Sequence, residues 1–197
     1  MTSPEVRGTS RDDAANIIRW TRVIITLALI PLGMHAFGGD GRVPLLGDID
    51  LAIHEFGHIL WSPFGDTLRI MGGSLTQILL PCVFDAYFLY GRREHRDSHA
   101  AMLCLWWTAM NILDLSVYAA DARAGQLMLL SGLTGEDDPE GHDFHNLFSR
   151  WGVLNRDTIY AGRMRGIAAF MCFLSILFGL YAAWNSQRKE PSAEASV

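Results

Sequence analysis

The chain has 197 residues, enough for one domain but hardly for two, and half of its residues are apolar while 19% are charged. That composition excludes a disordered or fibrous protein, and the net charge of −5 argues against nucleic acid as a partner. The three cysteines, Cys82, Cys104 and Cys172, form no CxxC pair, so the sequence predicts neither a disulfide framework nor a cysteine zinc site.

The first apolar segment, Ile17–Phe37, follows a polar stretch, residues 1–16, that we expect to be a loose tail. A bilayer-spanning helix needs about 20 mainly apolar residues, and this segment meets that length. It is longer than the apolar region of a secretory signal peptide, and no clear small-residue cleavage site follows it. We therefore expect a retained membrane span.

A short apolar helix is predicted over Leu51–Trp61, after a glycine-rich loop that carries several aspartates. Ser62 and Pro63 follow it, and proline ends the helix there because it cannot continue the ladder of hydrogen bonds. A helix of about 11 residues rises only about 16 Å, which is too short to cross a bilayer. This segment is expected to be re-entrant or buried.

Three further segments are long and apolar enough to span a bilayer: Ile70–Tyr90, Ala100–Ala120 and Gly166–Trp184. Asp85 is the only charged residue of the first, Asp114 is the only one of the second, and the third has none. An acidic loop precedes the last span, and a polar tail, residues 188–197, ends the chain. The predicted fold is an all-α polytopic membrane protein with four transmembrane helices, one short helix and a single membrane-embedded domain over residues 17–187.

The positions of the basic residues predict the orientation in the membrane. With four spans and a short helix that does not cross, three basic groups fall on one side: Arg7, Arg11, Arg19 and Arg22; Arg92, Arg93 and Arg96; and Arg188 and Lys189. Cytoplasmic loops carry an excess of lysine and arginine. We therefore expect an integral protein of the plasma or inner membrane with both termini in the cytoplasm.

The short helix carries the motif that points to chemistry, His54-Glu55-Phe56-Gly57-His58. Residues i and i+4 of a helix lie one above the other, so both imidazoles can bind one metal ion, which we expect to be Zn2+. Glu55 lies beside them and would be the catalytic base for an attacking water. Ionisable side chains are costly in so apolar a helix, which favours a metal site over the alternative, a buried cluster of hydrogen-bonded histidines.

A catalytic zinc site usually has three protein ligands, so one more residue is needed. Asp114 is the first candidate, and it belongs to a polar stripe on an otherwise apolar span, formed by Asn111, Asp114, Tyr118 and Asp121. The alternative role of this stripe is an internal hydrogen-bonded seam. The third ligand therefore stays open at this point.

The acidic loop offers the other candidates, His142, Asp143 and His145. His142 and His145 are three residues apart and could share one helix face. This group could supply the third metal ligand, a donor to the transition state or a second metal site. Its members could equally be loop residues without a role in chemistry.

The HExxH segment in an apolar helix resembles the HExGH motif of the site-2 protease family of intramembrane zinc metallopeptidases. The segment Gly72–Gln77 is similar to the small-residue and amide segment of that family, and Asn111–Asp114 stands where the family supplies an aspartate ligand, although Leu115 follows in place of the usual glycine. The resemblance implies that His54, His58 and Asp114 would be zinc ligands. It also implies that Glu55 would be the catalytic base and that Gln77 and Asn111 would position the substrate.

The sequence thus predicts a membrane-embedded zinc-dependent hydrolase, and first of all a metallopeptidase that uses a zinc-activated water to cleave membrane-associated peptides or proteins. Two alternatives stay open. One is a zinc hydrolase of a lipid or small amphiphile, and the other is a non-catalytic membrane subunit stabilised by a metal. Membrane lipids surround the chain in all three cases.

Overall fold

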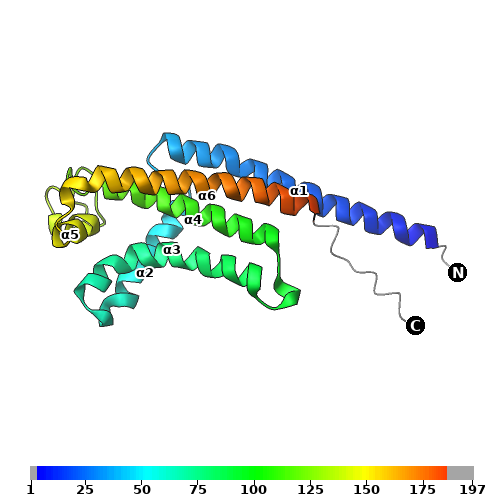
Figure 1. The fold of residues 1–197 in the computed structure, drawn as a ribbon, viewed down its shortest axis with the longest axis horizontal. Helices are drawn as coiled ribbons and strands as arrows, with labels where there is room; N and C mark the ends of the chain where they lie inside the picture. The colour runs from blue at the N-terminus through cyan, green and yellow to red at the C-terminus, as the bar shows by residue number, and fades with distance from the viewer. Residues whose placement is uncertain (1–3, 186–197) are drawn as a thin grey trace.

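The computed structural model describes residues 4–185, with side chains from Asp13 to Asn185. Within this range every long element is a helix (Figure 1). The helices are α1 (Pro4–Gly38), α2 (Leu46–Trp61), α3 (Asp66–Tyr90), α4 (Ser98–Ala120), α5 (Asp143–Arg150) and α6 (Asp157–Asn185). The predicted all-α class is confirmed.

Four segments are long and apolar enough to cross a membrane, which confirms the number of spans predicted from the sequence: Asp13–Gly38, Asp66–Tyr90, Ser98–Ala120 and Leu154–Trp184. Helix α2 has 16 residues and rises about 24 Å, which is still less than the roughly 30 Å of a hydrocarbon core. It is therefore a short helix that accompanies the four spans.

All five helices that contain a predicted segment begin earlier than the hydropathy predicts, and α1, α2 and α6 do so by the largest margins. Helix α1 begins at Pro4, so the expected loose tail is helical from that residue on, and α2 and α6 begin at Leu46 and Asp157. Proline is well suited to the first helical turn, and Asp48 and Asp157 lie in first turns where the helix dipole favours a negative charge. Hydropathy reports the part of a helix that lipid or core surrounds, whereas these polar first turns extend beyond it.

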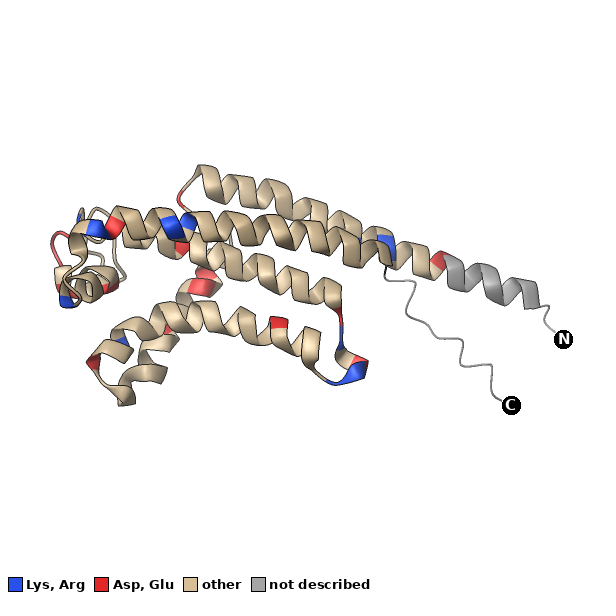
Figure 2. Ribbon diagram, viewed as in Figure 1, with Lys and Arg blue, Asp and Glu red and all other residues tan. Residues whose placement is uncertain are grey.

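Contacts at one end of the molecule bring two of the predicted basic groups together. Arg22 forms an ion pair of 2.6 Å with Asp97 in the turn between α3 and α4. The guanidinium of Arg19 lies 4.9 Å from the ring of Trp184, near the end of α6. Figure 2 shows blue segments at this end on α1 and on the turn after α3. The side chains of Arg7, Arg11, Arg188 and Lys189 lie outside the described residues.

Helix α4 is the centre of the bundle. Half of its apolar window is buried, against 11% for α1, so α4 packs on protein while α1 mainly faces the surroundings. Ala109 and Leu113 of α4 are fully buried in a core that also holds Ala36 of α1 and Ala168 of α6. The short helix α2 packs mainly on α3 and is joined to α4 by a side-chain hydrogen bond from Trp107 to Asp50.

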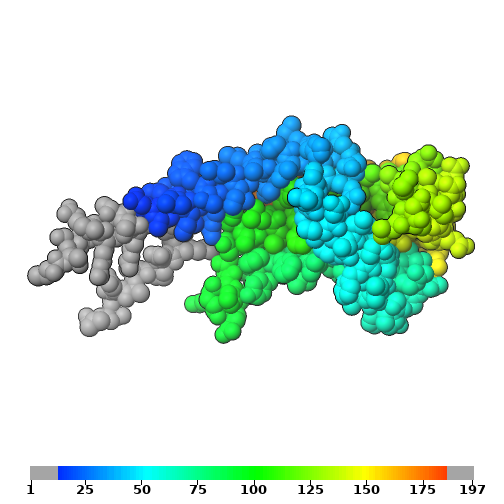
Figure 3. All heavy atoms as spheres, turned by 180° about the vertical axis from the view of Figure 1, so that it is seen from behind, coloured from blue at the N-terminus to red at the C-terminus, as the bar shows by residue number. Residues whose placement is uncertain are grey.

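Helix α2 lies on the surface between α1 and α3 (Figure 3). Its inner face is polar and small, with Asp50, His54 and Gly57 buried, whereas Phe56 and Ile59 on its outer face are 56% and 70% exposed. Asp50 accepts a hydrogen bond of 2.7 Å from Trp107 Nε1 of α4, and burial raises the pKa of this carboxyl to about 6. The chemistry-bearing face of α2 is thereby turned towards the bundle.

Residues 121–156, called the cap below, follow α4 and lie at the opposite end of the molecule from the end of α6 (Figure 1). The cap contains a hairpin with one isolated β-bridge, Met128 to Thr134, and the helix α5. Phe144 and Phe148 of α5 pack into a second core with Leu115 and Ala119 of α4. The acidic loop of the sequence is therefore a packed structure beside the end of α2.

Candidate metal centre

Close packing of α2 on α3 builds the back wall of the site. A Cβ on Gly57 would collide with the backbone oxygen of Gly72, and a Cβ on Gly72 would lie 2.7 Å from the oxygen of Gly57 and 2.8 Å from Cβ of Trp61. Such distances are far below van der Waals contact, so the two helices can approach this closely only because both positions are glycine. The approach brings the histidine face of α2 onto α3.

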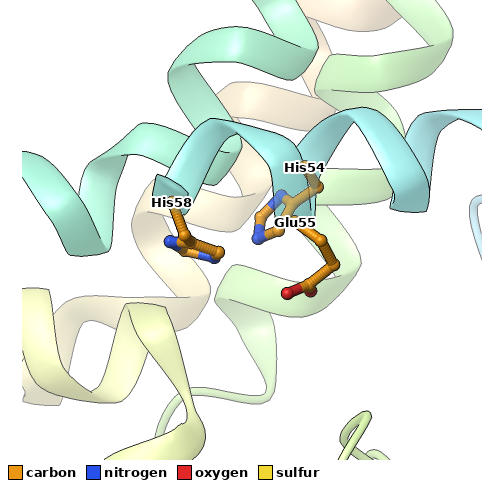
Figure 4. Close-up of side chains that lie close together, drawn as sticks. All are labelled: His54, Glu55 and His58. Atoms are coloured by element: carbon orange, nitrogen blue, oxygen red, sulfur yellow. The ribbon is translucent and has the colours of Figure 1, made fainter. Parts of the chain in front are cut away.

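His54, Glu55 and His58 leave α2 on the same side of the helix (Figure 4). Their ligand atoms all lie within 4.8 Å of one another. The two imidazole centroids are 4.9 Å apart. His54 is buried, while the Glu55 side chain is exposed, as a base that meets solvent or substrate would be. The predicted grouping of these three residues is present, and it could hold a metal ion.

Hydrogen bonds fix the orientation of both rings. His58 Nδ1 lies 2.8 Å from the backbone oxygen of Arg69, which can only accept, so this nitrogen carries the proton. His54 Nδ1 lies 3.0 Å from Oε1 of Gln77, which likewise accepts. Each neutral ring therefore directs the lone pair of its Nε2 away from these partners and towards the other ring.

Asp143, from the cap, completes the constellation. Its Oδ2 lies 3.0 Å from Nε2 of His54 and 3.2 Å from Nε2 of His58. Two nitrogen lone pairs and a carboxylate oxygen repel one another at such distances unless a positive charge lies among them. A proton on an imidazole can supply that charge, and so can a metal ion.

In the protein without metal the proton takes this place. The hydrogen bond to Asp143 raises the pKa of His58 to about 8 and outweighs the opposing effect of burial. Burial by itself would raise the pKa of Asp143, but the hydrogen bonds from His54 and His58 hold it below its ordinary value. The site thus keeps a carboxylate and attracts a cation.

The distances from Asp143 Oδ2 to the two imidazole nitrogens suit a metal ion. Ligands about 2.0–2.1 Å from a tetrahedral ion are about 3.3 Å apart, close to the observed separations from Asp143. Gly73 of α3 keeps the space between the nitrogens open, since a Cβ there would lie 2.7 Å from His58 Nε2 and closer still to His54 Nε2. The donor set, two imidazoles and one carboxylate, is a common one for zinc.

Asp114 lies behind the histidines. Its Oδ2 accepts a hydrogen bond of 3.0 Å from Nε2 of Gln77, and its Oδ1 is 3.7 Å from Nε of Arg42. Gln77 in turn contacts His54, so Asp114 is joined to the ring through an intervening amide. Asn111 is fully buried and donates to the backbone oxygen of Gln77. Of the polar stripe predicted on this span, Asn111 and Asp114 are thus hydrogen-bonded to α3.

The two loop histidines hold the cap together. His142 is fully buried, caps α5 by accepting from the backbone N–H of His145 at 3.2 Å, and stacks on Tyr118 at 4.3 Å between centroids. Burial lowers the pKa of His142. His145 Nδ1 donates to the backbone oxygen of Ala122 at 2.8 Å. Of the three loop candidates, the structure brings Asp143 to the motif histidines.

A cavity of about 650 Å³ opens in front of this constellation. The motif residues of α2 line one side, Tyr118 and Gln77 lie at the bundle side, and consecutive hairpin residues, Leu127 to Leu130, line another. The cavity is therefore polar at the histidines and apolar along the hairpin. A molecule larger than water can reach Glu55.

Sequence reasoning did not single out Gly73 as a spacer between the rings or Arg42 as the partner of Asp114. The glycine pair at positions 72 and 73 was a signal for the first, but nothing in the local sequence marks the second. Comparisons of this chain with protein-family models, characterised proteins and solved structures find no significant match. Any function must therefore be inferred from the geometry of the site.

Proposed function

We propose that the chain is a membrane-embedded zinc metallopeptidase that cleaves membrane-associated peptides. The observation that carries this proposal is the convergence of His54, His58 and Asp143 on one point beside Glu55, at the edge of a cavity. The three would hold the zinc ion at the edge of the cavity that Glu55 also lines. When bound, zinc supplies Lewis-acid activation of water and of a carbonyl group.

The chain's own residues would then move the proton. Glu55 takes the proton of the attacking water on its carboxylate and returns it to the leaving amine. The Tyr118 hydroxyl accepts from the backbone N–H of Asp143 at 3.0 Å, which leaves its own proton available to the oxygen of a substrate carbonyl in the cavity. Both groups line the same cavity as the histidines, as this chemistry requires.

An unpaired backbone edge favours a peptide over a lipid. Hydrogen bonds from Leu129 N to Leu133 O (2.8 Å) and from Gly135 N to Leu127 O (3.3 Å) flank the bridge at Met128. In this pattern the N–H and C=O of Met128 point away from the partner segment, and within the described range they have no hydrogen-bond partner. An extended peptide in the cavity could pair with this edge, whereas an acyl chain could not.

The experiment compares Glu55→Gln with the wild type, both loaded with zinc in detergent or in vesicles. Glu55→Gln removes the base and keeps the shape, so peptide cleavage should fall by about 100-fold or more while the zinc content stays equal. A library of transmembrane peptides and a panel of lipid esters would be offered in parallel. Equal turnover in Glu55→Gln refutes the proposed chemistry. Cleavage of the lipid esters and of no peptide would favour the lipid hydrolase alternative.

One observation favours a second candidate, a metal that only stabilises the cap. Asp143 comes from α5, which is also tied to α3 through Arg150, whose Nη2 lies 3.7 Å from Oδ2 of Asp66. A metal held by Asp143 would therefore fasten the cap onto α2 and α3. In that case zinc would raise the unfolding temperature of the wild type and of Glu55→Gln equally, and neither would cleave any substrate.

A further inference from the structure

A chain of polar side chains runs from the loop after α1 to the ring of His54. Arg42 Nε lies 3.7 Å from Asp114 Oδ1, Asp114 Oδ2 accepts from Gln77 Nε2 at 3.0 Å, and Gln77 Oε1 lies 3.0 Å from His54 Nδ1. Gln77 and His54 are only 2% and 6% exposed. Water cannot easily replace these hydrogen bonds, so the neighbouring side chains determine which atoms of this series carry protons.

The orientation of the Gln77 amide follows from its neighbours. Its Nε2 faces two oxygens, Oδ1 of Asn111 at 3.3 Å and Oδ2 of Asp114 at 3.0 Å. A flipped amide would direct its oxygen against both of these acceptors, at a cost of lost hydrogen bonds and added repulsion. Gln77 therefore offers its oxygen to His54, and His54 must carry its proton on Nδ1.

Arg42 lies at the far end of this series of hydrogen-bonded side chains, beside Asp114. Its Nη2 donates to the backbone oxygen of Gly47 at 2.6 Å, and a Cβ on Gly47 would lie only 3.0 Å from its Nε. The absence of a side chain at position 47 thus makes room for the guanidinium next to Asp114. Arg42 and the Gln77 amide both offer N–H groups to Asp114, so the carboxyl oxygens of Asp114 act as acceptors towards Gln77.

We propose that Asp114 is a positioning residue, which acts through Gln77 to hold His54 in the Nδ1–H tautomer with its Nε2 lone pair free for a metal ion. This inference rests on the proposed metal site in that the metal is what the lone pair binds. It differs from the role that the resemblance to site-2 proteases implies, in which Asp114 would itself be a ligand. Asp143 takes the ligand role instead.

The first experiment makes the same chemical change at both aspartates. Zinc affinity is measured by competition with a chromophoric chelator for Asp114→Asn and Asp143→Asn. In Asp114→Asn the oxygen of the new amide can still accept from Gln77, so this variant should weaken zinc binding less than about tenfold, whereas Asp143→Asn loses an anionic ligand and should weaken it more than about 100-fold. Equal large losses in both variants overturn the inference.

The second experiment exchanges the acid and the amide. Gln77→Glu alone sets two carboxylates against each other and should weaken zinc binding about 10- to 100-fold. In the double variant Gln77→Glu with Asp114→Asn, the new amide donates to the new carboxylate, which still accepts from His54, so the affinity should return to within about tenfold of the wild type. A double variant that binds no better than Gln77→Glu overturns the inference, because a metal ligand at Asp114 could not be restored in this way.

The third readout needs no metal. Nitrogen NMR of labelled histidines in the metal-free protein at alkaline pH, where imidazoles are neutral, reports which ring nitrogen carries the proton. The spectra are recorded in the Asp143→Ala background, because the Asp143 carboxylate, 3.0 Å from His54 Nε2, would otherwise draw the single proton of a neutral ring to that nitrogen. In this background His54 should be an Nδ1–H tautomer when Gln77 is present and a mixture in Gln77→Leu, while His58, which donates to Arg69, should not change. An unchanged His54 signal in Gln77→Leu overturns the inference. A wild type that binds no zinc sinks the proposed function, but this measurement still decides the role of Gln77.

Discussion

Gly73→Ala tests the metal centre with a single added methyl group. The new Cβ would lie 2.7 Å from His58 Nε2, and closer to His54 Nε2, in the space between the ligand nitrogens. Contact distances of about 3.5 Å require each ring to retreat by about 0.8 Å or more, whereas metal–ligand bonds tolerate only about 0.2 Å. At least one imidazole should be lost as a ligand, so zinc should bind about 100-fold more weakly or worse.

The loss can be followed without any substrate. At a zinc concentration of about 100 times the wild-type dissociation constant, binding stabilises the wild type by about 2.7 kcal/mol, and a 100-fold weaker variant by only about 0.4 kcal/mol. Thermal unfolding with zinc and with a chelator measures this difference directly. Gly166→Ala on α6 is the matched control, because its Cβ would meet no atom within 4 Å. A folded Gly73→Ala that binds zinc like the wild type would refute the placement of the metal between the two rings.

Three other changes test separate parts of the site. The pKa of His58 is raised from 6.5 to about 8, so the His58–Asp143 pair of the metal-free protein should stabilise the fold fully below pH 6.5 and lose this effect as the pH rises through about 8. Unfolding in chelator should reveal that slope, and Asp143→Asn should flatten it. Tyr118→Phe removes the acceptor of the Asp143 N–H and should weaken zinc binding by less than about tenfold. Tyr160→Phe is the control, and an unchanged zinc affinity in Tyr118→Phe would contradict this role. Gly57→Ala adds a Cβ that would collide with α3, so it should force the two helices apart and lower the free energy of unfolding by about 1–3 kcal/mol. A variant as stable as the wild type would contradict the close packing of α2 on α3.

The membrane-spanning fold could be predicted because hydropathy and length are properties of local sequence. Four apolar segments of sufficient length give four helices, and a fifth that is too short gives α2, whatever their packing. The helix ends were less predictable. Polar first turns, such as those with Asp48 and Asp157, continue a helix beyond its apolar part, and only their hydrogen bonds mark the true beginning.

The motif residues could also be predicted, because His54 and His58 are one helical turn apart and Glu55 is their neighbour, so their proximity needs no tertiary contact. The third residue at the site could not. Asp114 and Asp143 were both candidates for the third metal ligand, and both are far from the motif in sequence. Which of them contacts the histidines depends on how the cap folds back over α2.

By itself, then, the sequence determined a bundle of apolar helices and a pair of imidazoles on one face of a helix too short to span. The tertiary structure decided which carboxylate meets those imidazoles and which stands behind them. The physical reason is that periodicity acts over a few residues, whereas the cap is held on the bundle by buried rings such as Phe144 and Phe148 and by capping bonds such as that of His142. Those contacts join residues far apart in the chain, and no local pattern encodes them.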